Sequence, residues 1–214
     1  MASTNGGELA IPMAPRKVIN QLLRVEITCR GITSLLMNRV SEQDLLKIHG
    51  KIKDPKGAPR MEPHDEAKKK VYAYDEEKKK PYIPAKWLFS SLKSAGRFVR
   101  LDGKRQISTA TSTLLPQFMT IEDAAMALET PGWAVDIQQG RNPNGGELVV
   151  LVRPRFDAWQ FKVTVMIDTR EIDEAKIREL FDRSGRQCGL GDFRPNRGGL
   201  FGQFLVDAWK RLDA

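Results

Sequence analysis

The chain has 214 residues, which suits one domain and leaves room for a sizeable core. Its 35 lysines and arginines outnumber 27 aspartates and glutamates, giving a formal net charge of +8, and this excess favours a polyanionic partner. Cys29 and Cys188 do not form a metal-ligand cluster, no apolar run has the length of a membrane span, and the first 15 residues contain no apolar run of signal-peptide length. We therefore expect a cytoplasmic protein with no metal, no cofactor and no membrane partner.

The first part of the chain divides into an arm, a strand and an insertion. Residues 1–16, rich in Ser, Thr, Asn, Gly and Pro, predict a flexible N-terminal arm, and residues 17–214 predict a single domain. Apolar residues alternate with polar ones from Leu23 to Cys29, which predicts a strand with one buried face. From 41 to 82 the sequence becomes highly charged and loses apolar periodicity. We expect an insertion that projects from the domain, with a short hairpin around Val71–Tyr74.

A proline introduces the first predicted helix of the domain. Ile83-Pro84 precedes apolar residues at helical spacing, and a proline is tolerated in the first turn of a helix. These apolar residues form a stripe that we expect to be buried: Leu88, Leu92, Ala95 and Val99. Basic residues lie off this stripe: Lys86, Lys93, Arg97 and Arg100. One face of the helix is therefore predicted to be core and another basic.

The remaining elements predict the fold class. Residues 133–139 and 147–153 have the pattern of a hairpin, 158–167 that of a strand with one buried face, 173–183 that of a helix, and 201–207 that of a last strand. Without the insertion, the order is strand, helix, hairpin, strand, helix, strand. This order predicts an α+β ferredoxin-like domain of the split β-α-β type, in which two helices cover one face of a four-stranded antiparallel sheet.

A glycine-rich run between the second helix and the last strand, residues 188–202, is the main candidate for a binding site. It holds five glycines, two arginines and two phenylalanines. Glycine lets the backbone approach a ligand, and successive glycine amides form anion-binding surfaces. We interpret the run as a loop that binds a nucleic-acid backbone. The alternative is a long glycine-rich turn that contacts no ligand.

The positive charge is concentrated in two short stretches. Residues 86–105 hold six basic residues against one acidic, and residues 183–197 hold four against one, which together match the formal excess of the whole chain. If the fold brings the two stretches together, they form one basic groove. The predicted nucleic-acid-binding residues are Lys86, Lys93, Arg97, Arg100, Gly189, Gly191, Arg194, Arg197, Gly198 and Gly199.

The helix sequence IPAKWLFSSLKSAGR and the run GLGDFRPNRGGLFGQFLV give the chain a resemblance to a known family. Together with the expected fold, they resemble the RAMP superfamily of CRISPR-associated proteins, above all the single-domain backbone subunit that polymerises along guide RNA. In that family, an Ile-Pro-Gly-Ser-Ser-Leu type motif and a glycine-rich loop both contact RNA. Here Ala85-Lys86-Trp87 replaces the Gly-Ser-Ser cluster, and the loop is longer.

The resemblance implies partners and a cellular role. The expected nucleic-acid partner is single-stranded RNA. The expected assembly is a homo-oligomer or filament, or a multi-subunit ribonucleoprotein. The expected cellular role is antiviral defence. A single-stranded DNA-binding protein of a phage or mobile element is an alternative, because the sequence does not distinguish RNA from DNA. For either strand, the candidates for stacking on bases are Phe193, Phe201 and Tyr72. For Phe201, a purely structural role as a core residue at the start of a strand is the alternative.

Two other classes of function are a ribonuclease and a protein-interaction module. Some RAMP subunits cleave RNA with an acidic residue before the first helix, and Asp44, Asp54 and Asp65 lie in the matching region. The two histidines, His49 and His64, have no partnered nucleophile or base at a recognisable spacing, so we expect no catalysis. A protein-interaction module that uses its charge only for solubility is the third hypothesis.

Overall fold

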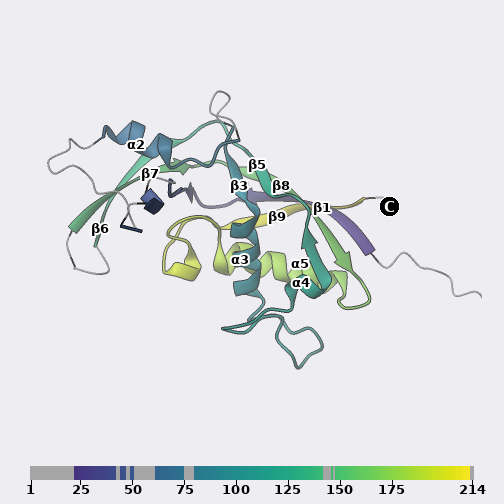
Figure 1. Ribbon diagram of the computed structural model, residues 1–214. Helices are drawn as coiled ribbons and strands as arrows, with labels where there is room; N and C mark the ends of the chain where they lie inside the picture. Colours follow the sequence, from purple (N-terminus) through teal and green to yellow (C-terminus); the bar gives the residue numbers. More distant parts are fainter. Residues whose placement is uncertain are drawn as a thin grey trace, which may run out of the picture.

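The computed structural model describes residues 22–41, 44–46, 49–50, 61–74, 80–141, 146 and 148–212 (Figure 1). The arm predicted at residues 1–16 lies outside this part of the chain, and so does Asp54. None of the helices formed by the described residues is long and apolar enough to cross a membrane.

The main sheet has the strand order β3-β5-β8-β1-β9, β4 also pairs with β8, and all of these pairs are antiparallel. Its strands are β1 (Leu22–Gly31), β3 (Tyr82–Pro84), β4 (Met119–Ile121), β5 (Ala125–Glu129), β8 (Gln160–Asp168) and β9 (Phe204–Leu212). Helices α3 (Ala85–Ala95) and α5 (Glu174–Arg183) lie on one side of it (Figure 1). The order β9-β1-β8-β5, with one helix after β1 and one after β8, is the predicted α+β ferredoxin-like arrangement.

Alternating side chains build the core between this sheet and the helices. Val25, Ile27 and Cys29 of β1 are fully buried, and so are alternate residues of β8. The predicted stripe of the first helix is also buried, from Leu88 to Val99. The short helix α4 (Leu115–Phe118) adds two further buried residues. The period-two and helical patterns of the sequence therefore identified the core correctly.

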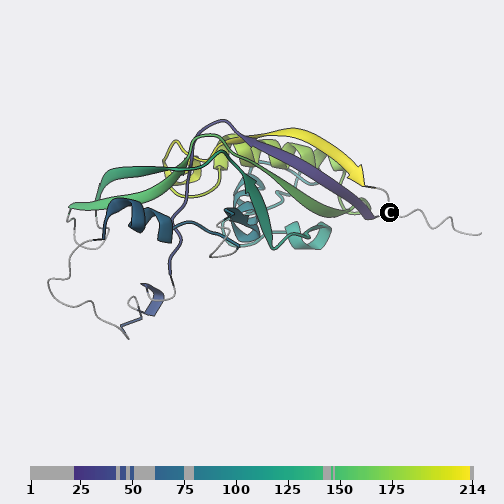
Figure 2. The ribbon, with the colours of Figure 1, turned by 90° about the horizontal axis from the view of Figure 1, so that it is seen from above.

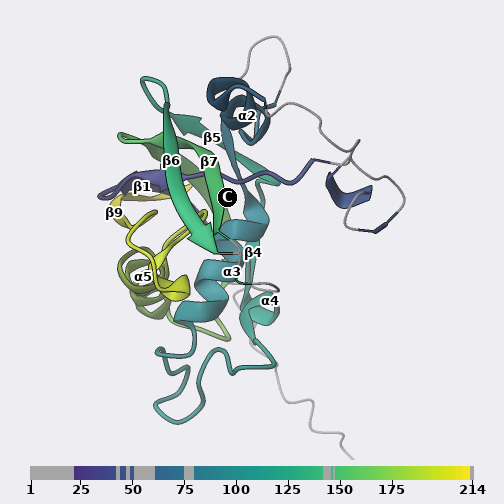
Figure 3. The ribbon, with the colours of Figure 1, turned by 90° about the vertical axis from the view of Figure 1, so that its left-hand side faces the viewer.

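The predicted hairpin forms, but it does not belong to the main sheet. Strands β6 (Ala134–Arg141) and β7 (Leu148–Phe156) pair with each other, and β7 also pairs with β2 (Leu35–Leu36), so they make a separate three-stranded sheet. The place expected for the hairpin beside β8 is taken by β4 and β5. Strand β5 buries Met126 and Leu128 in only five residues, too short a pattern to stand out in the sequence. Figure 3 shows the hairpin extending in front of the main domain.

Residues 63–70 of the insertion pack against this second sheet. Helix α2 (Pro63–Lys69) lies along β6 and β7 (Figure 2), and Ala67 is fully buried. The Lys70 ammonium group donates to the carbonyl oxygen of Val152, with a separation of 2.7 Å. The hairpin expected around Val71–Tyr74 is confirmed as a short pairing, in which the Tyr82 amide donates to the Tyr72 carbonyl at 2.8 Å.

Two predicted boundaries were wrong. Pro84 is the last residue of β3, and its extended backbone places it just before α3 rather than in the first turn. The last strand begins at Phe204 and continues to Leu212 rather than spanning 201–207, so Trp209 belongs to the strand. Phe204 is the buried residue at its start, whereas Phe201 is half-buried and precedes the strand.

The end of α5 offers a test of the packing. A Cβ atom at Gly185 would lie 2.1 Å from the carbonyl oxygen of Phe204, and a backbone atom cannot rotate away. We expect Gly185→Ala to lower the free energy of unfolding by about 3 kcal/mol, at the upper end of the range for overpacking. Thermal and urea denaturation measure this change in the free energy of unfolding.

Gly103→Ala is the control for that variant. Nothing lies within 4 Å of a Cβ at Gly103, and its φ of +78° costs an alanine only about 1–2 kcal/mol. A Gly185→Ala protein as stable as the control would contradict the packing described here.

Candidate nucleic-acid interface

The end of α5 is joined to α3 by a buried contact between two serines. A π-helical turn, η1 (Ser184–Cys188), continues α5, and the hydroxyl groups of Ser91 and Ser184 lie 2.8 Å apart in the core. At Gly185 the same turn meets the backbone of β9 so closely that no side chain fits. The fold thus fixes the start of the glycine-rich run against α3.

The glycines of residues 188–202, called the glycine loop below, mainly shape the loop. Four of them have φ between +70° and +76°, and a Cβ at Gly199 would lie 1.7 Å from the carbonyl oxygen of Phe193. The Gly189, Gly198 and Gly199 amides donate to carbonyl groups of Ser184, Pro195 and Arg194, over 2.8–3.1 Å. Contact between these amides and a ligand stays a prediction, because in this structure they bind within the chain.

An ion-pair network that the sequence did not reveal holds the glycine loop to the second sheet. The buried Arg153 guanidinium of β7 donates to Asp136 of β6 at 3.1 Å and to Asp192 of the loop at 3.0 Å. Gln138 accepts a further hydrogen bond from it at 3.0 Å. The Asp192 amide donates to the Leu36 carbonyl of β2 at 2.9 Å. The loop is therefore fixed on two sides, by α3 and by the second sheet.

The two basic stretches meet where α3 ends. The Asn196 amide group of the loop donates to the Ser94 hydroxyl of α3 at 2.9 Å. Burial raises the pKa of the Cys188 thiol, and the positive charges of Arg194 and Arg97 oppose this shift. Burial also lowers the pKa of Arg194, and the charge of Arg197 lowers it further. The hydrogen bond between Asn196 and Ser94 therefore brings the two stretches into contact at this end of α3.

We call this region the basic surface. It comprises the C-terminal half of α3, Gly96 and Arg97 directly after this helix, the turn η1 and the glycine loop. Arg194 is half-buried, and its guanidinium donates to the Gly191 carbonyl at 2.7 Å, which fixes its direction. Arg97, Arg186 and Arg197 are exposed. Lys93, one helical turn before Arg97, is half-buried on the same side of α3.

The other two predicted basic residues lie at the two ends of α3. Lys86 is exposed in the first turn, about 16 Å from Arg97 along the helix axis, and its ammonium group lies 5.8 Å from the centre of the Tyr72 ring. Arg100 is exposed beyond the last turn and donates to the Lys104 carbonyl at 2.8 Å. The structure brings Arg100 close to the basic surface and leaves Lys86 beside the insertion.

The candidates for base stacking differ in exposure. Tyr72 is half-buried and contacts Trp87 edge to face, with ring centres 5.1 Å apart, so both belong to the edge of the core. Phe193 has φ +49°, is 43% exposed and lies 6.2 Å from the Phe201 ring. Phe98 is 59% exposed, and sequence reasoning missed it because it falls beside the buried stripe of the first helix.

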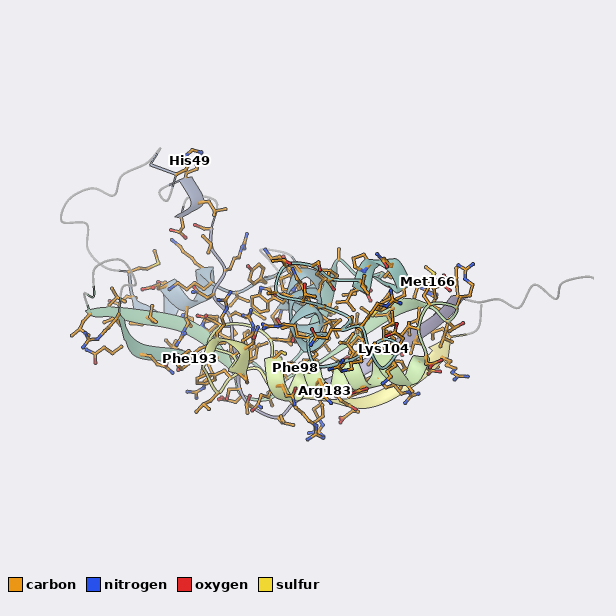
Figure 4. All side chains as sticks on the ribbon, turned by 90° about the horizontal axis from the view of Figure 1, so that it is seen from below. His49, Phe98, Lys104, Met166, Arg183 and Phe193 are labelled. Carbon is orange, nitrogen blue, oxygen red and sulfur yellow. The ribbon has the colours of Figure 1, made fainter. Side chains whose placement is uncertain are left out.

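The acidic candidates for catalysis lie elsewhere. Asp65 and His64 are exposed on α2, with 3.9 Å between Nδ1 and Oδ1, and the His64 ring stacks on Trp133 at 5.0 Å. Asp44 accepts hydrogen bonds from Ser41. Figure 1 shows α2 far from the C-terminal end of α3, and Figure 4 shows His49 far from Phe98. In the described part of the chain, no group of three or more His, Cys, Asp or Glu residues forms a metal site.

The fold and this surface define a ferredoxin-like α+β protein with an exposed cluster of arginines. No protein-family model matches the chain, and no curated protein matches it at a significant level. Among solved structures, the chain is similar to one in the cryo-EM structure of the type III-B Cmr-β complex bound to cognate target RNA, with 13% identity and a TM-score of 0.49. The match covers 90% of this chain, which spans 61% of that one.

The buried network yields a stability test. Arg153→Ala would leave Asp136 buried without its cation, and breaking such a pair costs about 3–5 kcal/mol. We expect a loss of about 3 kcal/mol in urea denaturation, with the hairpin becoming sensitive to limited proteolysis. Arg155→Ala, two residues away in an exposed pair with Asp157, is the matched control and should change stability little. Equal effects of the two variants would contradict a structural role for the buried network.

Proposed function

We propose that this protein binds single-stranded nucleic acid through the basic surface and performs no catalysis. The observation that carries the proposal is the hydrogen bond between Asn196 and Ser94, which holds the glycine loop, with Arg194 and Arg197, against the end of α3, three residues before Arg97. Like charges repel, and two of these side chains act unfavourably on each other. Phosphate groups would relieve this repulsion, and they are ligands that arginine binds well.

The opposite face of the main sheet supports this choice by contrast. There Arg24 pairs with Glu122 at 2.6 Å, and Arg30 pairs with Asp207 at 2.6 Å. On that face, strands β1 and β8 carry no aromatic side chain that could stack on a base. Charges neutralised by their neighbours attract a polyanion less than the clustered arginines do.

Binding of fluorescent single-stranded RNA and DNA of matched sequence tests the proposal. Anisotropy would be measured at low and moderate salt for wild type and for the double variant Arg194→Ala/Arg197→Ala. We expect the double variant to bind at least about tenfold more weakly and to lose about 0.7 from the salt slope for each phosphate contact removed.

Lys162→Ala/Lys210→Ala is the charge-matched control, because both lysines are exposed on the opposite face of the sheet. This control should bind almost as wild type. Equal losses in the two double variants would mean that only net charge matters, and no binding by wild type would leave the interaction module as the function to pursue.

We further propose that the strand is RNA and that the protein is a RAMP-type backbone subunit of a CRISPR ribonucleoprotein, acting in antiviral defence. This rests on the sequence resemblance of the first helix and the glycine loop to that family. The RNA-to-DNA affinity ratio in the same assay tests it. A preference for DNA would favour the single-strand-binding protein of a phage or mobile element. Time-dependent loss of full-length RNA would favour the ribonuclease.

Assembly of several copies along one strand is part of this proposal. On the hairpin, Ile137, Leu148 and Val150 are 50–62% exposed, an apolar surface that a neighbouring copy would cover. We expect light scattering to show complexes whose mass rises stepwise with RNA length, and Leu148→Asp/Val150→Asp to stop this growth at one copy. A monomer on every RNA length would contradict assembly.

A further inference from the structure

Phe98 is an aromatic side chain that the fold holds in solvent. It belongs to the turn that ends α3, where its amide donates to the Ala95 carbonyl at 2.9 Å. The next residue, Val99, is fully buried and anchors the turn to the core. With 59% exposure, Phe98 is the most exposed Phe, Tyr or Trp among the described residues. Because the side chain of Val99 is buried in the core, the ring of its neighbour Phe98 is left in solvent.

The residues around Phe98 are basic. Arg97 and Arg100 flank it in the sequence and are exposed, and Lys104 and Arg105 follow in the same loop. The single acid of this segment, Asp102, is engaged by the loop itself, because the Lys104 and Arg105 amides and the Arg105 side chain donate to its carboxylate. These hydrogen bonds hold the pKa of Asp102 well below its usual range.

Phe98 also continues the basic surface. Ser94, one turn earlier on α3, accepts a hydrogen bond from Asn196 of the glycine loop, and the exposed Arg97 directly precedes Phe98. In the view from below, Phe98 appears between Phe193 of the glycine loop and Lys104 (Figure 4). A strand whose phosphates contact Arg194 and Arg97 would therefore run beside Phe98, the residue that follows Arg97.

We propose that Phe98 stacks on an unpaired base of the bound strand, an inference that rests on the proposed function. An exposed ring beside arginines has the chemistry that binds a nucleobase, a π-face joined to a phosphate. The base must be unstacked from its neighbour to offer a face, so Phe98 makes the surface selective for single strands over duplexes. An apolar protein partner is the less favoured occupant, because it would have to bury the adjacent arginines unpaired.

The test separates stacking from phosphate binding. Affinity is measured for a uridine oligonucleotide and for an abasic oligonucleotide of equal length, which has the same phosphates and no bases. We expect Phe98→Ala to weaken binding of the uridine strand at least about fivefold, to leave binding of the abasic strand within about twofold, and to leave the salt slope unchanged. Phe98→Trp should retain wild-type affinity, and Phe98→Leu should not.

Leu45→Ala, which trims a side chain of similar exposure in the insertion, is the control and should leave both affinities unchanged. If wild type binds and Phe98→Ala binds equally well, the inference fails and the proposed function stands. Equal losses on both strands, or full rescue by leucine, would assign Phe98 a structural or purely apolar role and also overturn it. If wild type binds neither strand, both proposals fail.

Discussion

The close approach of the end of α5 to α3 and β9 is the constraint on which the rest of the site depends. At Ser184 and Gly185 the chain has no room for a larger side chain, since one neighbour is a buried hydroxyl and the other a backbone carbonyl. This contact sets where the glycine loop begins. It therefore also sets the distance between Arg97, just past the end of α3, and Arg194 in the loop, which are 97 positions apart in the sequence.

The loop that follows is held like a structural element rather than left as a mobile connection. Asp192 joins it to Arg153 of the second sheet, and Asn196 joins it to α3. A rigid loop can present arginines in fixed directions, which lowers the entropic cost of ligand binding. The same rigidity explains why the glycines contact the chain itself. They allow a tight loop to form, and the side chains between them supply the charge.

Sequence reasoning recovered the fold class, the buried faces of β1, β8 and α3, and the two basic stretches, because each depends on a local period or on composition. It misplaced the hairpin, since nothing local in residues 134–156 indicates whether the pair joins the main sheet or leaves it. Ligand binding by the glycine amides stays a prediction, and three of these amides donate to carbonyl groups of the chain itself. The Arg153 network and the exposure of Phe98 depend on tertiary contacts, which a single sequence does not reveal.

The central proposal is that a nucleic-acid strand lies along the end of α3 and the glycine loop. Photocrosslinking of 4-thiouridine-containing single-stranded RNA, followed by mass spectrometry of the crosslinked peptides, tests it most directly. A strand in this position will crosslink within residues 93–105 and 186–201. Crosslinks confined to the opposite face of the sheet, in residues 24–30 and 160–166, or to α2, would contradict it.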